Sequence, residues 1–238
     1  RTQSSLRFQP NETFDGTLSL AAAGRLTLGT VSSLGDLVLA GSAVVLDQTT
    51  VGGQLQIDTA GALTQRTADT LLRVSGNTRL AAGSITLGNA NTLTGSVALS
   101  TSGAAVLRTT GALDLATSTV GGSLTVTASG RISDSGVLRI AGDLRLDAGE
   151  RADIVLDAGG AFAAVHIDSA RDVVLVDTNA LALSGTVSRD LAVQAAGALT
   201  LGATTVGRDL SVTAAGLGDS GAVTVAGASV DRKSTRLN

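Results

Sequence analysis

The feature that most constrains this chain is a repeat of about 19 residues. Pairs of apolar residues separated by one residue recur along it, and complete neighbouring pairs are 18 to 20 residues apart. Two apolar residues at this spacing lie on one face of a β-strand. The pairs begin at Leu18, Leu37, Leu55, Leu124, Leu144, Val173, Leu191 and Leu210. The repeat therefore predicts a stack of short, equivalent strands.

A glycine follows many of these pairs, four residues after the second apolar residue. The glycines at this position are Gly24, Gly61, Gly130, Gly197 and Gly216. We expect each of them at a tight bend or at a backbone position with positive φ. The segments that begin at Ala112 and Ala198 match best, with an offset of 86 residues, which indicates a higher-order repeat. Each unit thus offers two or three short strands separated by turns.

These units fit one architecture better than its competitors. A unit of about 19 residues is shorter than a propeller blade of about 40. Its glycines would each cost a helical solenoid about 1 kcal/mol. Aromatic residues are 1% of the chain while hydrophobic residues are 43%, and a narrow coil interior explains this difference better than a sandwich or barrel core. The sequence predicts an all-β parallel β-helix of about 12 coils, a rod of about 55 to 60 Å at about 4.8 Å per coil.

The ends of the chain depart from the repeat. We expect residues 1–17 to be an irregular lead-in of a fragment and residues 18–230 to form a single β-helix. The last eight residues, Asp231–Asn238, contain the only lysine and match the translated start of a short-read sequencing adapter, so we expect a non-native tail. Residues 1–15 contain no apolar signal segment. Unpaired strand edges at both ends of such a fragment predict end-to-end self-association.

Composition excludes several classes of function. The net charge of −3 disfavours nucleic acid and anionic membrane surfaces as partners. No apolar stretch approaches the ~18 residues that a membrane-spanning helix needs. The absence of cysteine excludes disulfides and thiolate metal sites, and a single histidine excludes a multi-histidine metal site. We therefore expect no cofactor, no metal and no membrane insertion.

The segments 120–148 and 173–202 resemble the stalk repeats of bacterial filamentous-haemagglutinin-type exoproteins. The resemblance extends over most of residues 18–230. It implies a right-handed β-helix that a Gram-negative cell secretes by a two-partner or autotransporter route, with an outer-membrane transporter as partner during export. It also implies an extracellular, cell-surface location. Host-cell or matrix glycans and proteins would then be bound by regions outside this chain, since the family's secretion and anchoring domains have no counterpart here.

The expected function is that of a structural stalk segment in a large secreted or surface-exposed adhesin, without enzymatic activity. Two alternatives stay open. A carbohydrate- or host-surface-binding module would show a polar or aromatic patch repeated on one face of several coils. A polysaccharide-active β-helix enzyme would show Asp, Arg and His side chains that converge across adjacent coils.

Few residues carry chemistry, and we predict no catalytic, cofactor-binding or metal-binding residue. His166 and Asp168 share one strand face, opposite Val165 and Ile167, and we expect both to be solvated. The densest acidic stretch contains Asp147, Glu150, Asp153 and Asp157, but it lacks the glycine-rich signature of calcium-binding β-rolls, and Arg145 and Arg151 offset its charge.

Two recurring residue types favour structural roles. Asp36, Asp143, Asp190 and Asp209 each directly precede the first leucine of a pair, and an aspartate at one fixed place in the coil is expected in a turn. Thr125, Thr127, Ser211 and Thr213 alternate with apolar residues. Rows of this kind occur in ice-binding proteins, but the irregular coil lengths favour ordinary β-propensity on a solvated face.

Overall fold

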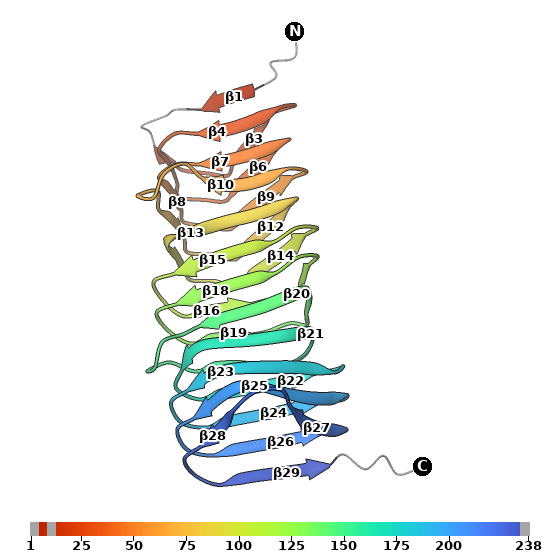
Figure 1. Cartoon of the computed structure of the whole chain (residues 1–238). Coiled ribbons are helices and arrows are strands. Elements are labelled where there is room, and N and C mark those ends of the chain that lie inside the picture. The colour runs from red at the N-terminus through yellow and green to blue at the C-terminus, as the bar shows by residue number, and fades with distance from the viewer. Residues whose placement is uncertain (1–4, 9–12, 234–238) are drawn as a thin grey trace.

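The computed structural model of this protein is a rod of stacked coils (Figure 1). It describes residues 5–8 and 13–233, and every regular element in these ranges is a β-strand. All strand pairs in the described ranges are parallel, and the chain makes about 12 turns with coils of about 19 residues. The prediction of a parallel β-helix is confirmed. The described residues contain no helix that is long and apolar enough to cross a membrane.

One series of paired strands, the long stack, runs from one end of the rod to the other. Its strands are β1 (Ser5–Phe8), β4 (Arg25–Leu28), β7 (Ala43–Leu46), β10 (Ala62–Gln65), β13 (Ser84–Leu93), β15 (Ala105–Thr109), β18 (Leu124–Ala128), β20 (Leu138–Asp147), β21 (Ile154–Ala170), β23 (Leu181–Val187), β25 (Ala198–Val206) and β27 (Gly216–Asp219). Each coil adds one strand to this stack, so the stack gives the rod a continuous face.

A second stack is equally continuous. It contains β3 (Leu18–Ala21), β6 (Leu37–Gly41), β9 (Leu55–Thr59), β12 (Thr78–Ala82), β14 (Val97–Thr101), β16 (Leu113–Leu115), β19 (Ile132–Asp134), the first part of β21, β22 (Val173–Asp177), β24 (Leu191–Ala195), β26 (Leu210–Ala214) and β29 (Ser229–Lys233). A shorter stack contains β2 (Thr13–Phe14), β5 (Val31–Ser33), β8 (Thr49–Val51) and β11 (Leu72–Val74). The remaining strands are β17 (Ser118–Val120), which pairs with β14 and β20, and β28 (Val223–Val225), which pairs with β25.

The core consists of the inward-facing residues of successive coils, which stack on one another. Leu37 lies between Leu18 and Leu55, and Leu124 lies between Ala105 and Leu144. The buried side chains form one cluster from Leu26 to Ala214. The apolar pairs that define the sequence repeat are therefore the inner lining of the coil, as period-two spacing predicts.

Four of the five glycines that follow the apolar pairs lie at bends, whereas Gly216 begins β27, and none of the five has positive φ. Positive φ occurs only at Gly149, Gly159 and Gly185 among the described residues. At Gly61 and Gly197 a Cβ atom would lie 2.4 Å and 2.6 Å from backbone atoms of the preceding coil. These positions require glycine because two coils approach closely there, which corrects part of the expectation.

The paired strands extend beyond the expected bounds of 18–230. Within residues 1–17, β1 pairs with β4 and β2 pairs with β5. At the other end β29 reaches Lys233 and pairs with β26, so residues 231–233 continue the ladder. Ser234–Asn238, the rest of the expected tail, lie outside the described residues.

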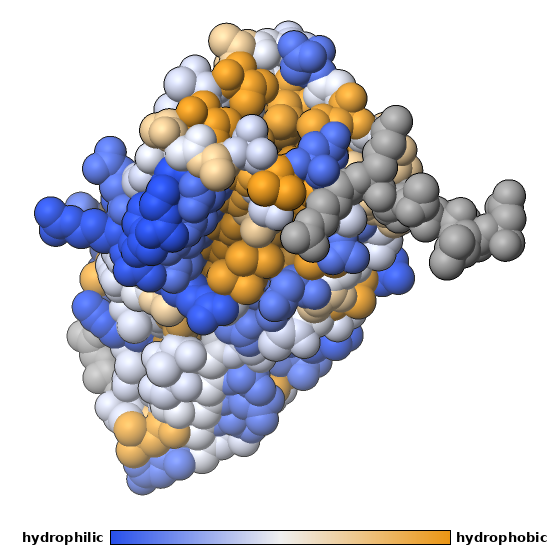
Figure 2. Space-filling view, turned by 90° about the horizontal axis from the view of Figure 1, so that it is seen from below, coloured by the Kyte–Doolittle hydropathy of each residue, from blue (hydrophilic) through white to orange (hydrophobic). Residues whose placement is uncertain are grey.

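Apolar surface gathers in the middle of the C-terminal end of the rod (Figure 2). A hollow of about 590 Å³ lies there between β25, β26, β27, β28 and β29. Leu217, Val223 and Val230 are inside or beside it and are 42%, 37% and 45% exposed. In the preceding coil, the partners of Leu217 and Val223 are the buried Leu199 and Thr204, whereas Val230 pairs with the exposed Ser211 and faces outward.

Candidate functional site

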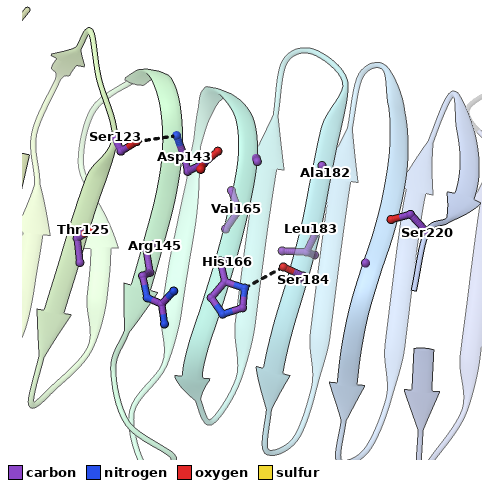
Figure 3. Close-up of a pocket in the computed structure, with 12 residues that line it drawn as sticks. Ser123, Thr125, Asp143, Arg145, Val165, His166, Ala182, Leu183, Ser184 and Ser220 are labelled. Carbon is purple, nitrogen blue, oxygen red and sulfur yellow. Dashed lines mark hydrogen bonds between the residues drawn. The ribbon is translucent and has the colours of Figure 1, made fainter. Parts of the chain in front are cut away.

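A row of polar side chains lies on the long stack, where four coils contribute one outward-facing residue each. Thr125 of β18 pairs with Arg145 of β20, Arg145 pairs with His166 of β21, and His166 pairs with Ser184 of β23. The four side chains form a row across the strands, along the axis of the rod (Figure 3). Parallel in-register pairing thus brings together residues that are far apart in sequence.

His166 connects two of its neighbours. Its Nδ1 lies 2.8 Å from Ser184 Oγ, and its Nε2 lies 3.2 Å from Asp168 Oδ1. An ionised carboxylate only accepts hydrogen bonds, so in the neutral imidazole Nε2 carries the proton and Nδ1 accepts one from the Ser184 hydroxyl. The prediction that His166 and Asp168 share a face is confirmed.

Arg145 fixes the carboxylate of Asp168. Its Nε donates to Asp168 Oδ2 at 2.7 Å, and its Nη2 pairs with the other carboxylate oxygen. A two-point pair of this kind restricts both side chains. Arg145, Asp168, His166 and Ser184 therefore form one chain of contacts over three coils, which we call the Arg145–Ser184 relay.

A β-bulge lies next to the relay. Leu146 pairs with Ile167 and Asp147 pairs with Ser169, so Asp168 has no partner residue in β20. Both Asp168 and Ser169 face outward between the buried Ile167 and Ala170. Strand alternation alone turns Asp168 outward beside His166, and the bulge adds Ser169 to the same face.

The relay borders a shallow groove of about 550 Å³. The groove exists because small residues, Ala164, Ala182 and Gly202, face outward beside it. At Gly202 a Cβ atom would lie 3.1 Å from Ser184 Cβ, so glycine keeps the space over Ser184 open. Asp143 lies on the opposite side of the groove, and its carboxylate has no hydrogen bond or ion pair within the described residues.

The acidic stretch before the relay does not converge on it. Asp153 is held by Arg171 through two contacts of 2.8 Å, and Asp147 accepts the backbone N–H of Gly149 at 3.0 Å. Glu150 is exposed in the loop between β20 and β21. No three His, Cys, Asp or Glu side chains in the described part of the chain are grouped as metal ligands would be. His166 therefore shares its groove with Arg145 and Asp143, not with Arg171 and Asp153.

Three of the four recurrent aspartates have the structural role expected of them. Asp36, Asp190 and Asp209 each accept, through Oδ1, the backbone N–H of the equivalent position one coil further on, at 2.7, 3.2 and 2.9 Å. Asp143 differs, because β20 continues through this position and turns the corner by a bulge. The expectation of a turn is wrong for Asp143, and its side chain is left to face the groove.

Sequence reasoning did not identify Ser184 or the role of Arg145. The information was present in the spacing, since Arg145, His166 and Ser184 are one coil apart. Alignment of successive coils by their apolar pairs would have stacked the three residues. Alternation places Asp168 on the same face, but its contact with Arg145 depends on side-chain conformations that the repeat pattern does not specify.

The comparisons with known proteins concern the repeat. A family model described as repeats of unknown function (DUF5649) matches residues 34–100, 102–167 and 188–234, which is more than half of the chain. The chain belongs to this family. The first two matched segments adjoin near the start of β15. Of the relay residues, Arg145 and His166 lie in the second matched segment, and Asp168 and Ser184 lie outside the matches. No curated protein and no solved structure matches the chain.

Proposed function

We propose that this chain is a segment of the structural stalk of a large secreted or surface-exposed bacterial adhesin of the filamentous-haemagglutinin type. The observation that carries the proposal is the long stack, which continues from β1 to β27 with one strand per coil. A fold that grows by adding coils along one axis gains length without needing a second core. This is the geometry that a spacer requires.

The mechanism is mechanical. Each coil contacts only its neighbours, so stability is approximately a sum of coil and interface contributions. Buried ladders of leucine, valine and isoleucine join the coils from Leu26 to Ala214. The rod then holds a distal binding region away from the cell. A chain without cysteine forms no disulfide before export, which suits passage through an outer-membrane transporter in an unfolded state.

We infer a non-enzymatic role for the described charged residues. Asp153, Asp172 and Asp190 bind arginines of neighbouring coils, and Asp36 and Asp209 cap backbone N–H groups. Arg145, Asp168 and His166 converge across adjacent coils beside a groove, which is the arrangement expected of the polysaccharide-active alternative. Arg145 and His166 occupy both oxygens of the Asp168 carboxylate, so this convergence favours binding of a carbohydrate over its hydrolysis.

Surface labelling tests the stalk proposal. Antibodies raised against the purified chain are applied to intact cells of the bacterium that carries its gene, and to the same cells after permeabilisation. The expected result is labelling of intact cells that external protease removes. Labelling that requires permeabilisation, or that survives protease on intact cells, would contradict the proposal. A cytoplasmic protein labelled in parallel controls for cell lysis.

A further inference from the structure

We propose that the groove beside the Arg145–Ser184 relay binds an extended, uncharged glycan that lies along the axis of the rod. This site is additional to the stalk role. Its polar groups come from successive coils of the long stack, and they stand about 4.8 Å apart along the axis. That spacing is close to the length of one pyranose residue in an extended chain, so one coil would contact one sugar.

The relay presents its polar groups in fixed positions. Arg145 is held by two contacts to Asp168, and His166 is held between Asp168 and Ser184. Side chains that are already ordered lose less conformational entropy when a ligand binds. Arg145 Nη1 has no partner among the described residues, and the side chain is 53% exposed, so Nη1 can donate to a ligand. Convergent polar groups of this kind fix the orientation of a ligand in a pocket.

Asp143 supplies the complementary acceptor. Its carboxylate faces the groove from β20, two residues before Arg145, and has no partner within the described residues. A carboxylate and a guanidinium on one strand face can bind neighbouring hydroxyl groups, one as acceptor and the other as donor. Ala182 and Gly202 leave room for the sugar rings over β23 and β25.

The charges of the groove select against acidic glycans. Asp143 and Arg145 line the groove, and the carboxylate of Asp168 beside it pairs with the Arg145 guanidinium. Asp168 occupies two donors of that guanidinium, so an added uronate would meet the unpaired charge of Asp143. We therefore expect a neutral oligomer to bind more tightly than an acidic oligomer of the same linkage and length.

Calorimetric titration of the full 238-residue chain tests the proposal. The probes are a β-1,4-linked glucose hexamer and the corresponding β-1,4-linked glucuronate hexamer. We expect saturable binding of the neutral hexamer with a Kd of about 1 mM or tighter. No saturable binding of the neutral hexamer, or tighter binding of the acidic one, would overturn the proposal. Both outcomes are independent of the cellular location that surface labelling measures, so a failure of the glycan proposal is distinguishable from a failure of the stalk proposal.

Two variants and their controls locate the site. Arg145→Met removes the donor, and Ala182→Gln fills the groove from an exposed position. Arg145→Met is expected to weaken binding about fivefold, the effect of one lost hydrogen bond. Ala182→Gln is expected to weaken binding at least as much, because its side chain occupies the space of a sugar ring. Arg108→Met on β15 and Ala192→Gln on β24 make the same changes outside this groove and should leave the Kd within about twofold. Equal losses in the control variants would overturn the assignment, as would hydrolysis of the hexamer, which would make the groove an active site.

Discussion

Two aspartates occupy inward positions along the coil, where leucine, valine or alanine is usual. Asp134 pairs with Leu115, and Asp177 pairs with Ala195 and is 2% exposed. Both carboxylates accept backbone N–H groups at corners, Asp134 from Asp157 at 2.9 Å and Asp177 from Phe162 at 3.0 Å. Burial raises the pKa of both carboxyl groups above the ordinary value, although these hydrogen bonds act in the opposite direction.

The raised pKa of Asp177 predicts the direction in which the free energy of unfolding changes with pH. The folded protein holds the proton more tightly than the unfolded chain, so this contribution to the free energy of unfolding is present in acid and is lost as the pH rises through the folded pKa. Asp177→Asn removes the titration. The melting temperature of Asp177→Asn should therefore improve relative to the parent as the pH rises from about 4, the ordinary Asp value.

The pKa of Asp190 is shifted in the direction opposite to that of Asp177. A hydrogen bond from Arg208 lowers the pKa of Asp190, so its contribution to stability is present above the ordinary Asp pKa and is lost as the pH falls through the folded pKa. Asp190→Asn should lower the melting temperature near neutral pH and have less effect in acid. Thermal melts of both variants over the same pH series check the two signs. Trends of the same sign would contradict the assignment.

Gly185 is the position where the backbone tolerates least change. Its φ is +134°, and a Cβ atom there would lie 2.0 Å from the carbonyl oxygen of Ile167 in the preceding coil. Gly185→Ala should lower the free energy of unfolding by about 1 to 3 kcal/mol or more. Gly111→Ala is the matched control, because no heavy atom lies within 4 Å of its Cβ position, and it should stay within about 0.5 kcal/mol. Urea denaturation measures both, and equal effects would contradict the prediction.

At the scale of elements, a ladder of ion pairs joins the coils that contain β21, β22, β24 and β26. An Arg-Asp dipeptide recurs at residues 171–172, 189–190 and 208–209, one coil apart. Each arginine contacts the aspartate of the preceding coil: Arg171 with Asp153, Arg189 with Asp172, and Arg208 with Asp190. The ladder favours one register between neighbouring coils, because a shift of one residue between neighbouring strands would move each arginine away from its aspartate.

The ladder is exposed, so its effect on stability should be small and sensitive to salt. The side chain of Arg208 is 52% exposed. Arg208→Gln should lower the free energy of unfolding only slightly at low ionic strength, and this difference should vanish near 1 M salt. Urea denaturation at both salt concentrations measures it. Arg73→Gln on β11, an exposed arginine without an ion pair in the described part, should show no such salt dependence.

The regular strands could be predicted from the sequence, but the irregular connections could not. Leu124 and Val126 recur with period two, and that spacing alone determines their inward orientation. The segment 66–71 lengthens one coil and is held by Gln65, Asn89 and the buried Asn91, whose side chains bond across it. Polar residues of this kind are typical of loops in any sequence, so their burial depends on tertiary contacts that no local pattern specifies.

At the scale of the whole molecule, the width of the coil sets the composition. The interior accommodates one fully buried aromatic side chain among the described residues, Phe162, and does so only beside a glycine. A Cβ atom at Gly160 would lie 2.1 Å from the Phe162 ring. The narrow interior inferred from the 1% aromatic content is thus consistent with the packing, since a large ring requires a neighbour without a side chain.

The C-terminal end of the described rod retains the features of an internal coil. The Asp-Ser-Gly sequence at 134–136 recurs at 219–221. In the interior, Asp134 accepts N–H groups of Asp157 and Ala158 in the following coil, at 2.9 and 3.3 Å. Asp219 offers the same acceptor beside the exposed Leu217 and Val223. This end therefore presents both the apolar surface and the acceptors that a further coil would use.

The 238-residue chain is predicted to associate end to end, because a second copy can supply that coil. All described pairings are parallel, so the C-terminal face of one copy fits the N-terminal face of the next, and such a contact does not close into a dimer. Sedimentation velocity should show an average mass that rises with concentration. Leu217→Lys with Val223→Lys should restore the monomer, whereas Val174→Lys, on the side of the rod at β22, should not. A chain that stays monomeric at every concentration, or that responds equally to Val174→Lys, would show that this end does not act as an interface.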